Sequence, residues 1–200
     1  MAAKKKVPPR AWQRMLSGRR LDLLDPSPLD IEVEDIAHGL ARVARWNGQT
    51  LGEHAFSVAQ HSILVEELCR ELSPGLSIDA CLTALLHDGA EYVIGDMISP
   101  FKAALGVDYR VFEDRLERAI HIRFGLPAVM PKNLHKLIKR ADHISAWHEA
   151  VVLAGFSADE ADEIFGKPDI RLTDPLVPMT APQAQSEFLK RFHALQNMVK

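Results

Sequence analysis

A histidine and an aspartate stand side by side, as His87 and Asp88, in an apolar segment that reads Ala-Leu-Leu-His-Asp-Gly-Ala-Glu over residues 84–91. Burying an imidazole or a carboxylate is costly unless the group is paired or bound to a metal. A fold that buries this segment must therefore bring partners to it from elsewhere in the chain. Three polar residues interrupt apolar faces in a compatible way, namely His61, Glu91 and Asp142. Together these residues predict a site for one or two divalent ions and favour a hydrolase.

Apolar residues recur at helical spacing along most of the chain, and no alternating pattern of useful length indicates strands. Asp30 is a candidate N-cap for the first long helix, and Asn47-Gly48 is a candidate stop. We therefore predict an all-α fold, a single bundle of about seven to nine helices. The expected helices cover residues 31–46, 54 or 57–72, 77 or 79–94, 99–105, 108–124, 131–154, 159–165 and 183–198.

The first 30 residues differ from the rest of the chain. They contain four prolines and little sustained periodicity apart from a short possible helix at residues 11–16. Proline removes a backbone donor and restricts the residue before it, so such a segment favours loops over regular elements. We predict an irregular N-terminal arm over residues 1–30 and one domain over residues 31–200.

Bulk composition excludes several classes of protein. A formal net charge of -3 argues against a nucleic-acid binder, which would be basic. Two cysteines do not make a disulfide framework, which favours a reducing compartment. No apolar stretch approaches the roughly 20 residues that span a bilayer, and no apolar segment follows the lysines at positions 4–6 as in a secretory signal. We expect a cytoplasmic protein that binds neither nucleic acid nor a membrane.

Three predicted helices each place an imidazole or a carboxylate toward the core. His61 lies on the apolar face of the second helix, His87 and Asp88 on the third, and Asp142 on the longest. Two nitrogens and two oxygens suit one divalent transition metal ion, with manganese, cobalt, iron, nickel and zinc all compatible and magnesium possible. Such an ion lowers the pKa of water and neutralises charge on a phosphoryl oxygen.

Each of these residues also has a structural interpretation. A single inward histidine such as His61 is more often a hydrogen-bonded core residue than a ligand, and a His-Asp dipeptide recurs by chance. Asp142 could pair with Lys139 or Arg140 on its own helix. The joint pattern favours a metal site, because a core does not need a run of interior polar groups.

The order of these residues, a histidine, then an adjacent His-Asp, then a distant aspartate, resembles the signature of the HD-domain phosphohydrolase superfamily. In this chain the positions are His61, His87-Asp88 and Asp142. The resemblance implies a helical HD fold, one divalent ion held by these four side chains, and a homodimer.

Further segments resemble one branch of that superfamily, the bacterial 5′-deoxynucleotidases, which remove phosphate from deoxyribonucleoside 5′-monophosphates. These segments are Arg45-Trp46, residues 57–62 (Ser-Val-Ala-Gln-His-Ser), and residues 87–96 together with Pro100 and Lys102. The resemblance covers roughly residues 31–150 and leaves the N-terminal arm and the C-terminal quarter unmatched, so base and sugar preference stays open.

The resemblance also implies catalytic roles for two carboxylates. Glu91 would orient or deprotonate the attacking water, or pass a proton to the leaving alkoxide. Its structural alternative is a salt bridge to a neighbouring helix. Asp96, after Gly95, would contact the substrate sugar or the phosphoryl end, and its alternative is to cap the next helix.

Substrate contacts are expected for five further residues, three from the resemblance and two, His38 and His54, because the site is rich in histidine. Arg45 would hold the phosphate through a bidentate contact, Trp46 would pack beside the sugar or base, and Lys102 is a further phosphate candidate. A surface arginine and a core tryptophan are the alternatives for the first two. His38 and His54 would lie around the ion or meet the phosphate, although structural roles are the alternative for both.

The sequence therefore predicts a metal-dependent phosphomonoesterase that acts on a small molecule, a (deoxy)ribonucleoside 5′-monophosphate. Two alternatives stay open. One is an HD phosphohydrolase acting on a triphosphate, a cyclic nucleotide or an alarmone, although the chain is short for the insertions of triphosphohydrolases and lacks the Gly-Tyr-Pro extension of the cyclic-dinucleotide branch. The other is a non-catalytic metal-binding sensor.

Overall fold

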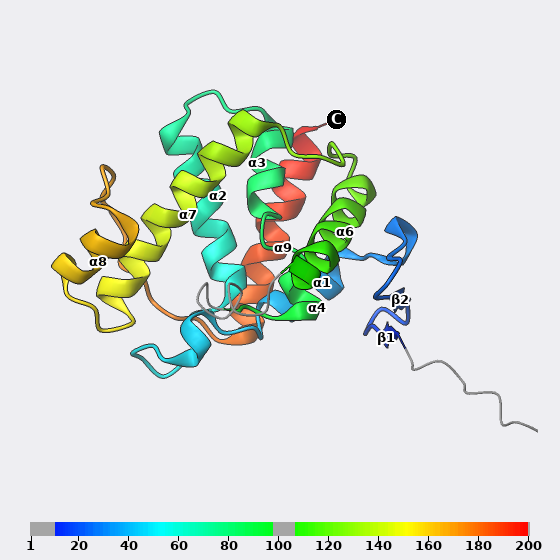
Figure 1. Ribbon diagram of the computed structural model, residues 1–200, viewed down its shortest axis with the longest axis horizontal. Coiled ribbons are helices and arrows are strands. Elements are labelled where there is room, and N and C mark those ends of the chain that lie inside the picture. Colours follow the sequence, from blue (N-terminus) through cyan, green and yellow to red (C-terminus); the bar gives the residue numbers. More distant parts are fainter. Residues whose placement is uncertain (1–10, 98–106, 200) are drawn as a thin grey trace, which may run out of the picture.

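The computed structural model describes residues 11–97 and 107–199. Helix α2, Val58–Leu72, lies at the centre of the fold. This helix packs against α7 (Lys132–Val152) on one side and against α3 (Ile78–Leu85) on another (Figure 1). It begins where the sequence predicts, because the Ser57 hydroxyl oxygen accepts the Gln60 backbone N–H as an N-cap. Its position between two other helices fixes the side chains of its first two turns, which include His61.

The remaining helices surround this centre. Helix α1 (Val33–Leu40) packs against α4 (Glu91–Ile94) and α9 (Ala181–Met198), and α8 (Ala158–Phe165) packs against α7. Helix α6 (Val107–Arg123) runs beside the 3-10 turn η1 (Pro28–Asp30). The described residues thus form eight α-helices, which confirms the all-α prediction and its range of helix numbers. None of these helices is long and apolar enough to cross a membrane.

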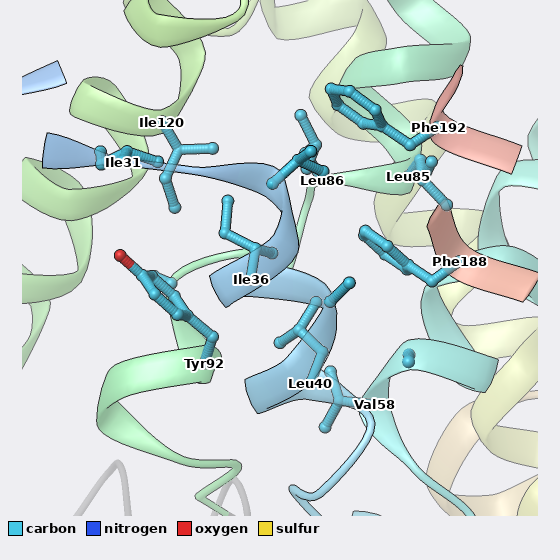
Figure 2. Packing of buried hydrophobic residues seen from close by; sticks show 14 of the residues in the cluster. Ile31, Ile36, Leu40, Val58, Leu85, Leu86, Tyr92, Ile120, Phe188 and Phe192 are labelled. Atoms are coloured by element: carbon cyan, nitrogen blue, oxygen red, sulfur yellow. The ribbon is translucent and has the colours of Figure 1, made fainter. Parts of the chain in front are cut away.

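Two apolar clusters hold the helices together. The larger one joins α1, α3, α6 and α9, and Figure 2 shows Ile36, Leu86, Ile120, Phe188 and Phe192 meeting in it, all almost completely buried. The smaller cluster lies between α2 and α7. The ion-binding side chains expected from the sequence lie at the α2–α7 contact and at the end of α3, so both clusters support them.

The helix predicted over residues 31–46 is shorter than expected, which corrects the placement of Arg45 and Trp46 on it. Helix α1 ends at Leu40, and the chain then extends so that Ala44 pairs with Ser57 in an isolated antiparallel bridge. The Arg45 backbone N–H donates to the Phe56 carbonyl at 2.9 Å. These long-range backbone hydrogen bonds replace those that another helical turn would form at residues 43–45, and they bring Arg45 beside the start of α2.

The helix predicted to run through His87 and Asp88 is also interrupted. Helix α3 ends at Leu85, residues 86–90 form turns, and α4 begins at Glu91. The Gly89 N–H donates to the Leu86 carbonyl at 2.8 Å, and a Cβ on Gly89 would lie 2.8 Å from that same oxygen. A residue without Cβ therefore permits the tight turn that carries the His-Asp pair.

The described part of the N-terminal arm contains a β-hairpin, and the short helix predicted at residues 11–16 is wrong. Strands β1 (Trp12–Arg14) and β2 (Arg20–Asp22) pair antiparallel, with Gln13 opposite Leu21. Leu21 is completely buried in the larger core. The Ser17 N–H and hydroxyl donate to the buried Asp35 carboxylate at 3.0 and 2.5 Å. These tertiary contacts select the hairpin, which local periodicity did not indicate; the domain boundary at residue 30 stays a prediction.

Candidate metal and phosphate site

The side chains of His61, His87 and Asp88 converge at the end of α3. One ligand atom from each lies within 4.8 Å of the others. The Asp88 Oδ2 atom is 3.4 Å from His61 Nε2 and 3.2 Å from His87 Nε2. From α7, the Asp142 Oδ1 atom approaches His61 Nε2 to 3.2 Å. The structure thus brings together the four residues predicted as ligands, with Asp142 outside the tight group of three.

These contacts do not have the geometry of hydrogen bonds. Among the described residues, neither His61 Nε2 nor His87 Nε2 has a hydrogen-bond partner, although both nitrogens are buried. Ligands that each stand about 2.0–2.2 Å from a shared ion are themselves about 3 Å apart. Nitrogens and carboxylate oxygens that approach to 3.2–3.4 Å without bonding to one another therefore fit a divalent ion.

The tautomer of His87 agrees with this role. Its Nδ1 atom is 2.9 Å from the Ala84 carbonyl oxygen. A carbonyl oxygen only accepts, so Nδ1 carries a proton, and it is Nε2 that can offer a lone pair to a metal ion.

Electrostatics also favour a cation at this point. Burial and the Arg45 charge oppose a proton on His61, but the carboxylates of Glu149, Asp142 and Asp88 outweigh them and raise the pKa of His61 well above its ordinary value. Burial likewise opposes a charge on Asp88, yet the two imidazoles hold the pKa of this carboxyl well below its usual range. The cluster stabilises positive charge, which a divalent ion supplies when bound.

Glu149 is the residue whose importance sequence reasoning missed. It lies on α7 two turns after Asp142 and is completely buried. Its Oε1 atom is 2.6 Å from His61 Nδ1 and accepts the Ser145 hydroxyl at 2.7 Å. The spacing of seven residues from Asp142 placed Glu149 on the same helix face, and a carboxylate in an otherwise apolar stretch was the signal that could have identified it.

Arg45 meets this carboxylate from the other side. Its Nε donates to Glu149 Oε2 at 3.1 Å, and its NH1 nitrogen is 3.7 Å from Asp96 Oδ2. Burial by itself would lower the pKa of Arg45, but Glu149 and Asp96 outweigh burial and raise it above its ordinary value. Burial would likewise raise the pKa of Glu149, but Arg45 and His61 hold it well below its usual range. Arg45 and Asp96, predicted respectively for phosphate and catalysis, thus lie in direct contact.

Trp46 adopts a strained backbone conformation beside Arg45. Its φ and ψ angles are 57° and 28°, and those of Asn47 are 51° and 29°. The left-handed region is unusual for a bulky side chain, costs on the order of 1–3 kcal/mol, and clusters at functional sites. The Trp46 indole N–H donates to Glu149 Oε2 at 2.8 Å, and its ring packs against Phe156 and Phe165 at centroid distances of 5.7 and 5.9 Å. These contacts hold the strained residue in place.

Glu91 opens α4 immediately after the His-Asp turn. Its side chain is buried, with 2% of the residue exposed, and its backbone N–H donates to the Asp88 carbonyl at 3.0 Å. Helix α1 fits against this segment because Gly39 has no Cβ: one built there would lie 2.7 Å from Tyr92 Cβ. The catalytic role of Glu91 stays a prediction.

The remaining predicted substrate residues are less closely connected to the ion site. In the described part of the chain, no hydrogen bond or ion pair joins the side chains of His38 and His54 to the four ligands, and both side chains are half-buried. Their substrate contacts stay predictions. Lys102 and the helix predicted at residues 99–105 lie outside the described residues.

Comparisons with known proteins place these features in a family. No family model matches the chain. Over 194 residues the chain is 58% identical to an uncharacterized protein of Rhodobacter capsulatus, covering 93% of this chain and 96% of that one. Over 181 residues it is 30% identical to the uncharacterized protein YfdR of Escherichia coli, covering 86% and 88%. The chain belongs to the family of these two proteins.

A solved structure decides the fold. The HD phosphohydrolase DatZ of cyanophage S-2L, bound to dA and one catalytic Zn²⁺ ion, superposes with a TM-score of 0.53 at 23% sequence identity, covering 84% of this chain and 98% of DatZ. The chain has the HD-domain fold. This confirms the fold predicted from the resemblance, and in this HD-domain protein His61, His87-Asp88 and Asp142 occupy one site, as the resemblance implied.

Proposed function

We propose that this HD-domain protein is a metal-dependent phosphohydrolase that releases phosphate from (deoxy)ribonucleoside 5′-monophosphates. The observation that carries the proposal is the shared carboxylate of Glu149, which contacts the ion-site residue His61 and the buried cation Arg45 at the same time. An ion site with a guanidinium held beside it suits a phosphate ester, whose oxygens are neutralised by both.

A divalent ion bound by His61, His87, Asp88 and Asp142 would supply a water of lowered pKa and neutralise phosphoryl charge. Arg45 would bind the phosphate. Its Nε donates to Glu149 and its NH1 lies 3.7 Å from Asp96, so the NH1–NH2 side of the guanidinium would meet the phosphate beside Asp96.

The buried carboxyl of Glu91 would hold a proton or move it at the attacking water or the leaving 5′ oxygen. Asp96 would fix the Arg45 guanidinium and contact the sugar or the phosphoryl end. Trp46 would present its ring to the sugar or base beside Phe156 and Phe165. The dA bound to DatZ supports a nucleoside as the organic part of the substrate. A homodimer and a cytoplasmic location remain part of the same proposal.

The test is phosphate release by metal-stripped protein that is resupplied in turn with manganese, cobalt, nickel, zinc or magnesium. The substrates are deoxyribo- and ribonucleoside 5′-monophosphates, and the matching triphosphates, cyclic nucleotides and a guanosine tetraphosphate. The expected result is ion-dependent release of inorganic phosphate from monophosphates. We expect Glu91→Gln to abolish turnover and to keep its ion, whereas Glu163→Gln, an exposed carboxylate on α8, retains wild-type rates.

Release of triphosphate or pyrophosphate in place of phosphate would favour the alternative function, an HD phosphohydrolase acting on another nucleotide. Tight binding of one ion with no turnover on any substrate would favour the non-catalytic sensor. Either result would be consistent with the proposed ion site and would refute the proposed monophosphatase activity.

A further inference from the structure

We infer that Glu149 is a positioning residue that fixes the ion site and the phosphate site relative to each other through its two carboxylate oxygens. The part of this inference that concerns phosphate rests on the function proposed above. Oxygen Oε1 serves the ion side, where it meets His61 and Ser145. Oxygen Oε2 serves the phosphate side, where it meets Arg45 and Trp46. Each half of the site is thus fixed to the same fully buried group.

On the ion side, Glu149 determines which nitrogen of His61 is available. Arg45, Trp46 and Ser145 all donate to the Glu149 carboxylate, so its oxygens act as hydrogen-bond acceptors. His61 Nδ1, at 2.6 Å, must therefore carry the proton and donate it to Oε1. An imidazole that coordinates an ion would then use Nε2, the atom that faces Asp88 and Asp142. A carboxylate that fixes a ligand imidazole in this way also raises its basicity.

On the phosphate side, Glu149 sets the direction of the guanidinium. The Nε donor of Arg45 is engaged with Oε2, which turns the NH1–NH2 side of the guanidinium away from Glu149 and brings NH1 to 3.7 Å from Asp96. The Trp46 indole donates to the same oxygen and holds this residue in its left-handed conformation. Without that acceptor, the strain at Trp46 favours a different path of the chain, and Arg45 would shift with it.

The charge and symmetry of a carboxylate are both needed. Four donors, from His61, Ser145, Arg45 and Trp46, meet its two oxygens. A glutamine offers one oxygen and one NH₂ group. If the NH₂ group faces Arg45 and Trp46, two donors lose their acceptor. If it faces His61, it donates to Nδ1, and the imidazole proton moves to Nε2, where it blocks the ion.

The decisive variant is Glu149→Gln, measured by two binding constants as well as by turnover. The first is the Kd for Zn²⁺ or Mn²⁺, titrated against a chelating indicator. The second is the Kd for inorganic phosphate on the ion-loaded protein, by calorimetry, with KM and kcat on the best monophosphate beside it. We expect the ion Kd or the phosphate Kd to rise by 10–100-fold, the size seen when outer partners of metal ligands are removed.

Two milder variants separate the halves and remain informative if Glu149→Gln does not fold. Trp46→Phe removes a donor to Oε2 only, so we expect a weaker phosphate Kd, a higher KM and an ion Kd within twofold of wild type. Ser145→Ala removes a donor to Oε1 only, so we expect a weaker ion Kd with the phosphate Kd of saturated protein unchanged.

A merely structural Glu149 would give the opposite result. Glu149→Gln would then lower the melting temperature and leave both binding constants of the folded protein within twofold of wild type, and Trp46→Phe and Ser145→Ala would not split them. The ion and phosphate titrations do not need turnover. A wild-type protein that binds both but hydrolyses nothing would overturn the proposed function, while a 10–100-fold loss in Glu149→Gln would still assign the positioning role.

Discussion

Replacing Arg45 by alanine should destabilise the fold as well as the proposed phosphate site. The Arg45 side chain is 14% exposed and pairs with Glu149, which is completely buried. Truncation removes a charge-assisted hydrogen bond of 3.1 Å and leaves a buried carboxylate without its cation. Breaking a buried pair from one side costs about 3–5 kcal/mol. His61, Ser145 and Trp46 continue to donate to the carboxylate, which places the expected loss near about 3 kcal/mol.

Urea unfolding followed by circular dichroism measures this loss. With an m-value of about 2.5 kcal/mol/M, a loss of about 3 kcal/mol lowers the midpoint by about 1.2 M. The matched control is Arg140→Ala, because Arg140 pairs with Asp169 on the surface and both side chains are more than half exposed. An exposed pair contributes about 0–1 kcal/mol, so its midpoint should move by less than about 0.4 M. All proteins are compared at one metal content.

Equal midpoints for Arg45→Ala and Arg140→Ala would refute the reasoning. They would mean that Glu149 finds full compensation from its neutral donors, so that the guanidinium adds nothing to the folded state. A drop in midpoint together with a change in m-value would instead indicate altered compactness, and the free energies would then be compared by thermal unfolding.

Three further predictions concern other parts of the fold. Burial, Asp114 and Glu113 raise the pKa of Glu117 from 4.5 to about 7. An acid whose pKa is raised in the folded state destabilises the fold as pH rises through about 4.5–7, so the free energy of unfolding of Glu117→Gln should exceed that of wild type by up to about 3 kcal/mol at pH 8 and by little at pH 4. Urea unfolding of the metal-stripped proteins measures this difference, and equal pH profiles would contradict it. Gly39→Ala should cost about 1–3 kcal/mol and reduce turnover, because its Cβ would lie 2.8 Å from the Tyr92 carbonyl oxygen beside Glu91; an unchanged melting temperature would show that α1 and α4 separate freely. Ser17→Ala should cost about 1–3 kcal/mol by leaving Asp35 under-bonded, and limited proteolysis should then cut within residues 12–22, whereas wild-type resistance would show that the hairpin does not depend on this contact.

Much of the fold could be predicted because its signals are local. Helix α2 starts at a serine cap, and α8 and α9 begin with capping boxes that involve Glu160 and Gln183. The long periodic helices were therefore placed to within a few residues. The proximity of His61, His87 and Asp88 could be predicted for a similar reason, because a buried polar run needs partners whatever the details of packing.

The parts that the sequence did not reveal depend on contacts between distant residues. Helix α1 ends early because residues 43–45 bond with residues 56–58, and no local propensity marks that exchange. Strand β2 forms because Leu21 enters the core. Glu149 was visible on a helix face, but its role depends on His61 from α2 and on Arg45 after α1. Helical spacing within one element cannot show a contact among side chains from three separate segments.

The bridge between Ala44 and Ser57 makes the intervening loop a closed ring, with a second tie where the Leu51 N–H donates to the Leu153 carbonyl at 2.8 Å. The backbone of Arg45 is held by its bond to Phe56, at the base of the ring, rather than by residues 48–54 at the tip. Doubling the length of such a loop costs only about 0.6 kcal/mol in closure entropy. A longer or altered segment at residues 48–54 would therefore leave the backbone bond between Arg45 and Phe56 in place, which makes this loop a position that tolerates insertions without displacing Arg45.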